Sequence, residues 1–141
     1  KAALAEGIVP GGGVTLINLA TTITTSNDDE AAIAAGKMLL KNALEQPFRI
    51  LMTNAGLNAD EWLPQVKNAK PGQGVNVNDP AKLVDMKAVG VVDPARVTKE
   101  ALLNAVSIAG TSMTMGALVV EVPEANAAAP AMPDMGGMGM M

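Results

Sequence analysis

The sequence predicts a mainly α-helical fold, a helical bundle with one or two short strands. Of the 141 residues 49% are hydrophobic, but the chain has one Trp, one Phe and no Tyr. Its core must therefore be built from Ala, Val, Leu, Ile and Met, and such small side chains favour closely packed helices. Apolar residues recur at helical spacing in several segments, whereas only short runs are typical of strands. At this length we expect one domain, over residues 1–122, followed by a tail over residues 123–141.

Helices are predicted over most of the first 68 residues. Residues 1–7 have the composition of the last turns of a helix, and a break follows that contains Pro10 and three consecutive glycines. The next helix is expected over residues 14–23. A further helix start lies at residues 27–30, where a cap candidate precedes acids near the positive end of the helix dipole. This helix should continue to about Leu44.

Pro47 should then end the helix, since proline removes a backbone donor and clashes with the preceding turn. Helical spacing resumes at Phe48 and should end at Gly56. Asn58 is the expected N-cap of a short helix over residues 59–68. After a turn cluster at residues 70–74, residues 75–78 are expected to form a short strand.

Asp93 and Pro94 form the clearest predicted helix start, with an acid at the N-cap and proline at the first helical position. The helix that follows is apolar around so much of its surface that both sides should be covered. Residues 117–122 are predicted to form one strand, whose partner must lie in missing sequence or in another subunit. Residues 123–141 have no periodic apolar face and are predicted to be disordered.

Composition excludes several classes of function. The net charge is −4 and there is no basic cluster, so nucleic acid is not an expected partner. The absence of Cys and His excludes disulfides, zinc sites and catalysis by those residues. Proline, glycine or polar residues interrupt the two uncharged windows, 7–27 and 101–120, so no membrane span is expected. No basic leader precedes an apolar stretch and a cleavage site, and we expect a cytoplasmic protein.

Three segments could carry chemistry, and each has a plainer alternative. Residues 11–13 could offer bare backbone to a nucleotide or could be a flexible joint, and they match neither nucleotide-binding fingerprint. The Asp93 carboxylate could hold a pair of ribose hydroxyls or cap its helix. Asn76 and Asn78 could bond the edge of a purine or simply occupy a turn.

Two further groups could bind metal. The acids at residues 28–30 could form a metal site or a solvated helix start. Methionines in the tail could bind Cu(I) or serve as an apolar tether.

Four motifs, in order, resemble the carboxy-terminal portion of a group I chaperonin of the GroEL type. They are residues 5–14 (AEGIVPGGGV), 74–76 (GVN), 89–97 (VGVVDPARV) and the Gly/Met-rich end at 135–141. The resemblance spans essentially the whole chain. It implies the carboxy-terminal half of the equatorial ATP-binding domain, with strands that pair outside this segment.

The resemblance also implies roles for individual residues. Gly12 would approach the nucleotide, Asn76 and Val77 would contact the adenine, and Asp93 would hold the ribose of ATP or ADP. The family usually has alanine where this chain has Val77, and the segment from Asn76 to Gly90 is one residue longer than usual. Residues for the phosphates, for Mg²⁺ and for hydrolysis lie upstream in the family, so no catalytic or metal-binding residue is expected in this chain.

As a function, the resemblance implies an ATPase that encapsulates non-native proteins and assists their folding. The implied partners are other copies of the subunit in two stacked seven-membered rings, a GroES-type co-chaperonin, and unfolded client proteins. The chain alone is expected to be inactive as an ATPase. The alternative is a non-catalytic α-helical binding module whose Gly/Met tail contacts apolar partners.

Overall fold

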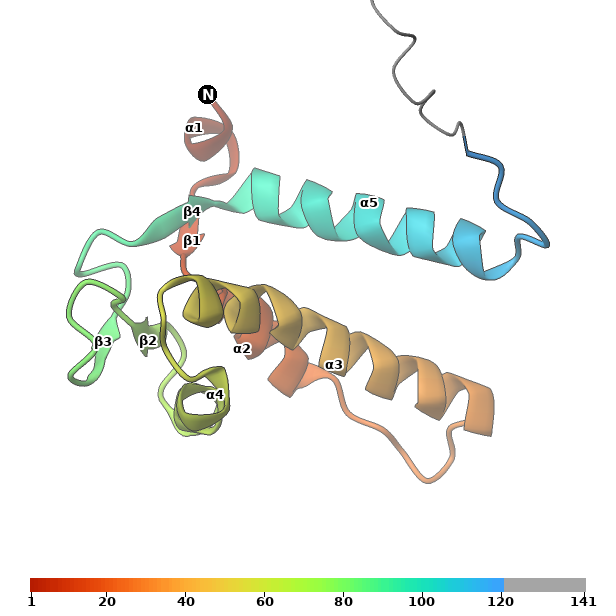
Figure 1. The fold of residues 1–141 in the computed structure, drawn as a ribbon, viewed down its shortest axis with the longest axis horizontal. Helices are drawn as coiled ribbons and strands as arrows, with labels where there is room; N and C mark the ends of the chain where they lie inside the picture. The colour runs from red at the N-terminus through yellow and green to blue at the C-terminus, as the bar shows by residue number, and fades with distance from the viewer. Residues whose placement is uncertain (121–141) are drawn as a thin grey trace, which may run out of the picture.

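The computed structural model describes residues 1–120, and within them the fold is mainly helical, as predicted (Figure 1). The elements in order are α1 (Ala2–Glu6), β1 (Ile8–Pro10), α2 (Val14–Thr22), α3 (Ala31–Asn54), α4 (Ala59–Asn68), β2 (Gln73–Val75), β3 (Leu83–Asp85), β4 (Val92–Pro94) and α5 (Ala95–Met113). The predicted bounds of α2 agree to within one residue, and those of α4 agree at both ends. Asn58 is the N-cap of α4, as expected, and its side-chain oxygen accepts a hydrogen bond of 3.0 Å from the Asp60 N–H.

The prediction that Pro47 ends a helix is wrong. α3 continues through Pro47 as one helix of 24 residues. One face of α3 buries Leu44, Phe48 and Met52, which lie on both sides of the proline. Burying each such side chain contributes about 1.5–3 kcal/mol, so together they offset the roughly 3 kcal/mol that an interior proline costs.

The four strands observed within residues 1–120 pair with one another, whereas the sequence predicted only one or two strands that pair outside the chain. The outside partner predicted for residues 117–122 stays a prediction. β1 and β4 are antiparallel, with Val9 opposite Asp93, and β2 and β3 are antiparallel, with Gly74 opposite Val84. The strand expected at residues 75–78 starts two residues earlier and already ends at Val75, because the chain turns at Asn76 to bring β3 back beside β2.

The predicted strand at residues 117–122 is not observed over residues 117–120. Its last two residues, and the predicted disordered tail at 123–141, lie outside the described residues.

One core joins α2, α3, α4 and the β2–β3 hairpin. Its buried residues are Val14, Ile17, Phe48, Met52, Leu63, Val66, Val75 and Met86. α5 stands apart from this core and packs on α1 and β4 at its amino-terminal end (Figure 1). Within residues 1–120 no residue of α5 is buried, although the sequence predicted cover on both sides. In the same part of the chain, no helix has the length and apolarity needed to cross a membrane.

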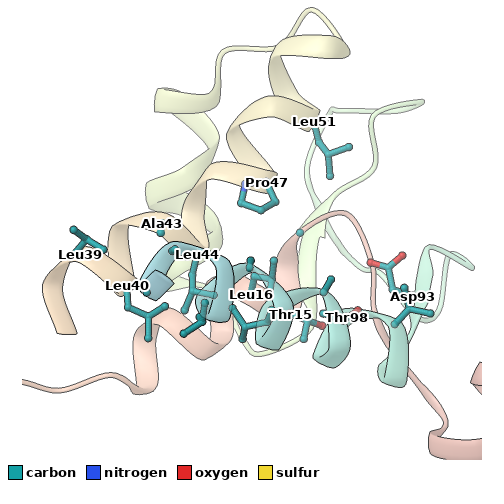
Figure 2. Close-up of a pocket in the computed structure, with 18 of the residues that line it drawn as sticks. Thr15, Leu16, Leu39, Leu40, Ala43, Leu44, Pro47, Leu51, Asp93 and Thr98 are labelled. Carbon is teal, nitrogen blue, oxygen red and sulfur yellow. The ribbon is translucent and has the colours of Figure 1, made fainter. Parts of the chain in front are cut away.

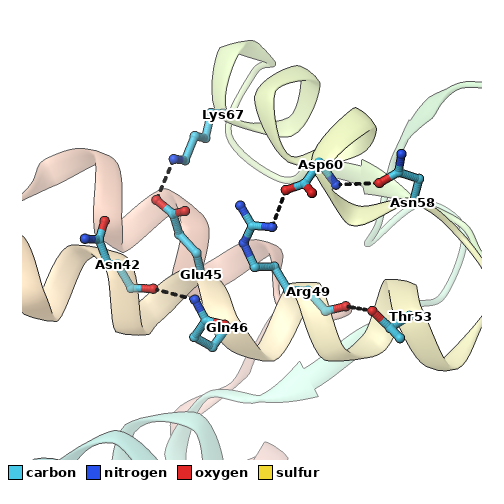
Figure 3. A network of polar contacts seen from close by, with 8 residues as sticks. All are labelled: Asn42, Glu45, Gln46, Arg49, Thr53, Asn58, Asp60 and Lys67. Carbon is cyan, nitrogen blue, oxygen red and sulfur yellow. Dashed lines mark hydrogen bonds and ion pairs between the residues drawn. The ribbon is translucent and has the colours of Figure 1, made fainter.

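Two ion pairs join α3 to α4 (Figure 3). Lys67 pairs with Glu45, whose side chain is only 8% exposed. Arg49 pairs with Asp60, whose side chain is 79% exposed. A buried carboxylate depends on its partner far more than an exposed one, because water cannot replace the lost interaction.

Replacing Lys67 by Met should lower the free energy of unfolding by about 3 kcal/mol, because Glu45 is left buried and unpaired. The matched control, Asp60→Asn, breaks the exposed pair and should cost less than about 1 kcal/mol. Urea unfolding followed by circular dichroism measures both. Equal losses in the two variants would contradict the role given to burial at Glu45.

Candidate functional site

The turn at residues 11–13, between β1 and α2, is closely packed on three sides. Gly12 and Gly13 have φ of +65° and +78°, a region that residues with a side chain rarely adopt. A Cβ added at Gly11 would lie 3.1 Å from the backbone nitrogen of Val92. One added at Gly12 would lie 2.9 Å from Cε of Met86, and one at Gly13 would lie 3.0 Å from the backbone of Phe48. These contacts argue against a flexible joint, because each glycine lets a different element approach the turn.

Asp93 lies in β4, opposite Val9, and does not cap α5 as the sequence predicted. The N-cap of α5 is Pro94, and no side chain bonds to the helix start. Pairing with β1 keeps Asp93 in the extended strand, and its position is one residue before the N-cap of α5. Its side chain is exposed, and none of the four ion pairs found within residues 1–120 involves it. The carboxylate is therefore available to a ligand.

Asn76 and Val77 occupy the turn that follows β2. The Asn76 side-chain oxygen accepts a hydrogen bond of 3.1 Å from the Asn78 N–H, and its carbonyl accepts one of 3.0 Å from the Asp79 N–H. The ordinary role of asparagine in a turn is thus confirmed. The side-chain amide nitrogen of Asn76 is not used in either bond and can still donate to a ligand. Val77 is 45% exposed.

Two strands bring Gly12 and Asp93 together. Gly11, beside Gly12, donates its N–H to the Val91 carbonyl at 2.9 Å, two residues before Asp93. Asn76 directly follows β2, and β2 starts close to the end of β1. A Cβ added at Gly72 would lie 3.6 Å from Cγ of Pro10. Three of the predicted site residues thus come from neighbouring segments around the glycine turn.

The acids at residues 28–30 precede α3, which begins at Ala31. Both Asp29 carboxylate oxygens accept hydrogen bonds from Lys37 Nζ, at 2.7 and 2.9 Å, and one accepts from the Ser26 N–H at 2.8 Å. The Lys37 bond, followed by the Ser26 bond, lowers the pKa of Asp29 from its ordinary value of 3.8. These partners give Asp29 a structural role. Within residues 1–120 no three acidic side chains gather into a possible metal site.

An apolar groove of about 870 Å³ separates α3 from α5 (Figure 2). Leu39, Leu40 and Leu51 line it from α3, and Val97, Leu102 and Val106 line it from α5. Its polar side chains are Thr15, Thr98 and Asp93. Both threonine hydroxyls donate to backbone carbonyls, at 2.7 and 3.4 Å, so Asp93 contributes the charged group at one end of the groove.

Sequence reasoning missed Met86 and the groove. Met86 is a single methionine directly after β3, and no local pattern marks it. The groove could be suspected only from the unusually wide apolar surface predicted for the last helix.

Residues 1–123 match the model of the TCP-1/cpn60 chaperonin family. Among solved structures, the chain is similar to a group III chaperonin in the open state, with a TM-score of 0.76 and 30% identity over 84% of this chain and 25% of that one. It is similar in fold to an open-state monomer of a group II chaperonin from Methanococcoides burtonii. That match has a TM-score of 0.70 and 21% identity over 77% of this chain and 28% of the other. The chain therefore spans about a quarter of the length of these two proteins.

Replacing Gly13 by Ala should lower the free energy of unfolding by about 2 kcal/mol or more. The new Cβ would press on the Phe48 backbone, and residue 13 would have to keep its left-handed conformation with a side chain attached. The matched control is Gly36→Ala in α3, where a Cβ meets nothing within 4 Å. This control should raise stability by up to about 1 kcal/mol through helix propensity. Urea unfolding compares the two, and a shift of the same sign and size in both would contradict the packing argument.

Proposed function

Because the chain belongs to the TCP-1/cpn60 chaperonin family, we propose that it is the carboxy-terminal half of the equatorial domain of an ATP-dependent chaperonin. The observation that carries the proposal is the exposed Asp93 carboxylate beside the tightly packed glycine turn. In this proposal the chain supplies the base and ribose side of a nucleotide site. The remaining parts of that site belong to a longer polypeptide.

The residues around the turn fit a nucleoside. An ionised carboxylate accepts hydrogen bonds in pairs, so Asp93 suits the two adjacent hydroxyls of a ribose. Met86 packs against Gly12 on the side where a Cβ would lie. Gly12 is still partly exposed, so a ligand can approach its backbone from the other side. The Asn76 amide and the half-exposed Val77 would hold the edge and face of the adenine.

Phosphates and Mg²⁺ need other partners. We propose that residues outside this chain hold them, as the resemblance to the GroEL type implies. Bound ATP would supply the free energy of its hydrolysis for a change in subunit conformation. The chain itself would bind and orient the nucleoside, and by itself would hydrolyse no ATP.

The apolar groove supports the half-domain proposal. Leu39 of α3 and Val97 of α5 are 64% and 54% exposed, and many of their neighbours along the groove are also apolar. Leaving such a surface in water is unfavourable by about 25 cal/mol per Å². We propose that the rest of the equatorial domain fills the groove and so completes the cover that α5 lacks within residues 1–120.

The finer assignment follows the sequence motifs. The Gly/Met-rich end and the order of the four motifs favour a group I chaperonin of the GroEL type in the cytoplasm. Its subunits would assemble into two stacked seven-membered rings and would work with a GroES-type co-chaperonin on unfolded client proteins. ATP binding would favour one ring conformation through contacts that differ between the two states.

A non-catalytic helical binding module is the second candidate. The open groove between α3 and α5 favours it, because a concave apolar surface suits an amphipathic helix of another protein. Calorimetric titration with ADP separates the two candidates, since a module of this kind has no nucleotide affinity.

Replacing Asp93 by Ala in the full-length subunit should weaken ADP binding about 30-fold, since a hydrogen bond to a charged group contributes about 2 kcal/mol. Asp60→Ala is the control, because it removes the same charge from an exposed position on α4. The control should leave the dissociation constant unchanged within about twofold. Unchanged ADP affinity in the Asp93 variant would overturn the ribose assignment.

Cysteine labelling tests the occupant of the groove. The natural chain has no cysteine, so Ala105→Cys places a single thiol in the groove and Glu100→Cys places one on α5 outside it. In the isolated chain both thiols should react rapidly with a maleimide. In the full-length subunit, freed of other cysteines, the Cys at position 105 should be protected at least about tenfold relative to the control. Equal reactivity of the two thiols there would contradict the half-domain proposal.

A further inference from the structure

Met86 lies against two glycines from separate segments of the chain. It follows β3 directly and is only 1% exposed. A Cβ added at Gly12 would lie 2.9 Å from its Cε, and one added at Gly74 would lie 3.1 Å from both its Cγ and its Sδ. The Cβ at Gly74 would lie still closer to Cγ2 of Val14, the first residue of α2. Met86 and Val14 together therefore set how closely the glycine turn and β2 can approach each other, and of the two only Met86 also contacts Gly12.

The backbone of Met86 ties the same region together. Its N–H donates to the Gly72 carbonyl at 3.1 Å, just before β2, and its carbonyl accepts from the Val91 N–H at 2.8 Å, just before β4. The Val91 carbonyl in turn accepts the Gly11 N–H. Met86 is thus joined to all three segments that carry Gly12, Asn76 and Asp93.

We propose that Met86 is a positioning residue of the nucleotide site, which fixes the spacing of Gly12, Asn76 and Asp93. This inference rests on the proposed function. Binding groups must be held within about 0.5 Å of their working positions by the packing behind them. Methionine suits the task because it is unbranched and long enough to reach from Gly74 to Gly12. The nucleotide itself does not contact Met86 in this proposal.

A core role alone is the competing explanation, and Met52 provides the comparison. Met52 of α3 belongs to the same core and is also 1% exposed. It is not among the nearest atoms to either glycine. Met86→Ala and Met52→Ala delete the same atoms from equally buried positions, so both should lower the midpoint of thermal unfolding by similar amounts.

The test is ADP binding by calorimetry in the full-length subunit, at a temperature where both variants are folded. Met86→Ala should weaken ADP binding about tenfold or more, whereas Met52→Ala should change it by less than about twofold. In a double variant with Asp93→Ala, the two losses should not add, because Met86 acts through the position of Asp93. Equal ADP affinity in the two alanine variants would overturn the inference.

If Met86→Ala does not fold, the two leucine variants Met86→Leu and Met52→Leu test the inference instead. Met86→Leu keeps most of the volume and should fold, but it has no atom that reaches the place of the terminal methyl beside Gly12. It should weaken ADP binding several-fold, while Met52→Leu should not; identical affinities would again overturn the inference. Normal binding by the wild type, weakened by Asp93→Ala but equal in both methionine variants, would leave the proposed function standing. Absence of ADP binding by the wild type would instead overturn the proposed function, and this inference with it.

Discussion

Close backbone contact at residues 11–13 holds the elements of this structure together. The three glycines meet β4, Met86 and α3, each so closely that an added Cβ would make a contact tighter than an ordinary van der Waals contact. Because of these contacts, α2 begins beside β4, and α3 passes close behind the turn at Phe48. Glycine is therefore required here by packing inside the protein, whether or not a ligand approaches the outer side. The same constraint places Asp93 beside Gly12.

Packing on one side of the turn is complete, and on the other it is not. Below it, α2, α3, α4 and the β2–β3 hairpin share one buried core. Above it, α5 is attached through α1 and β4, with Lys99 paired to Glu6 at 3.1 Å. The groove between α3 and α5 thus has an exposed apolar surface along its length and, at one end, the Asp93 carboxylate, which is in no ion pair within residues 1–120. A larger domain around this part of the chain would explain both features, because it would cover the apolar surface and complete the site around Asp93.

α3 shows how tertiary contacts outweigh local preference. Pro47 costs a backbone hydrogen bond, yet the helix continues because buried residues on either side of it pack on the same core. Glu45 is buried on this helix and is compensated by Lys67 from α4. A reader of the sequence sees only a proline and a charged residue at these places, each of which argues against a long buried helix.

The sequence by itself determined the helical class, the bounds of α2 and α4, the Asn58 cap and, through the order of its motifs, the family. These features depend on spacing and on local hydrogen bonds, which a linear pattern records. The tertiary structure decided the strand pairing, the passage of α3 through Pro47, the release of Asp93 from its expected cap and the place of Met86. Each of these depends on contacts between residues far apart in the chain. Local propensities of at most a few kcal/mol cannot fix such contacts when burial contributes as much or more.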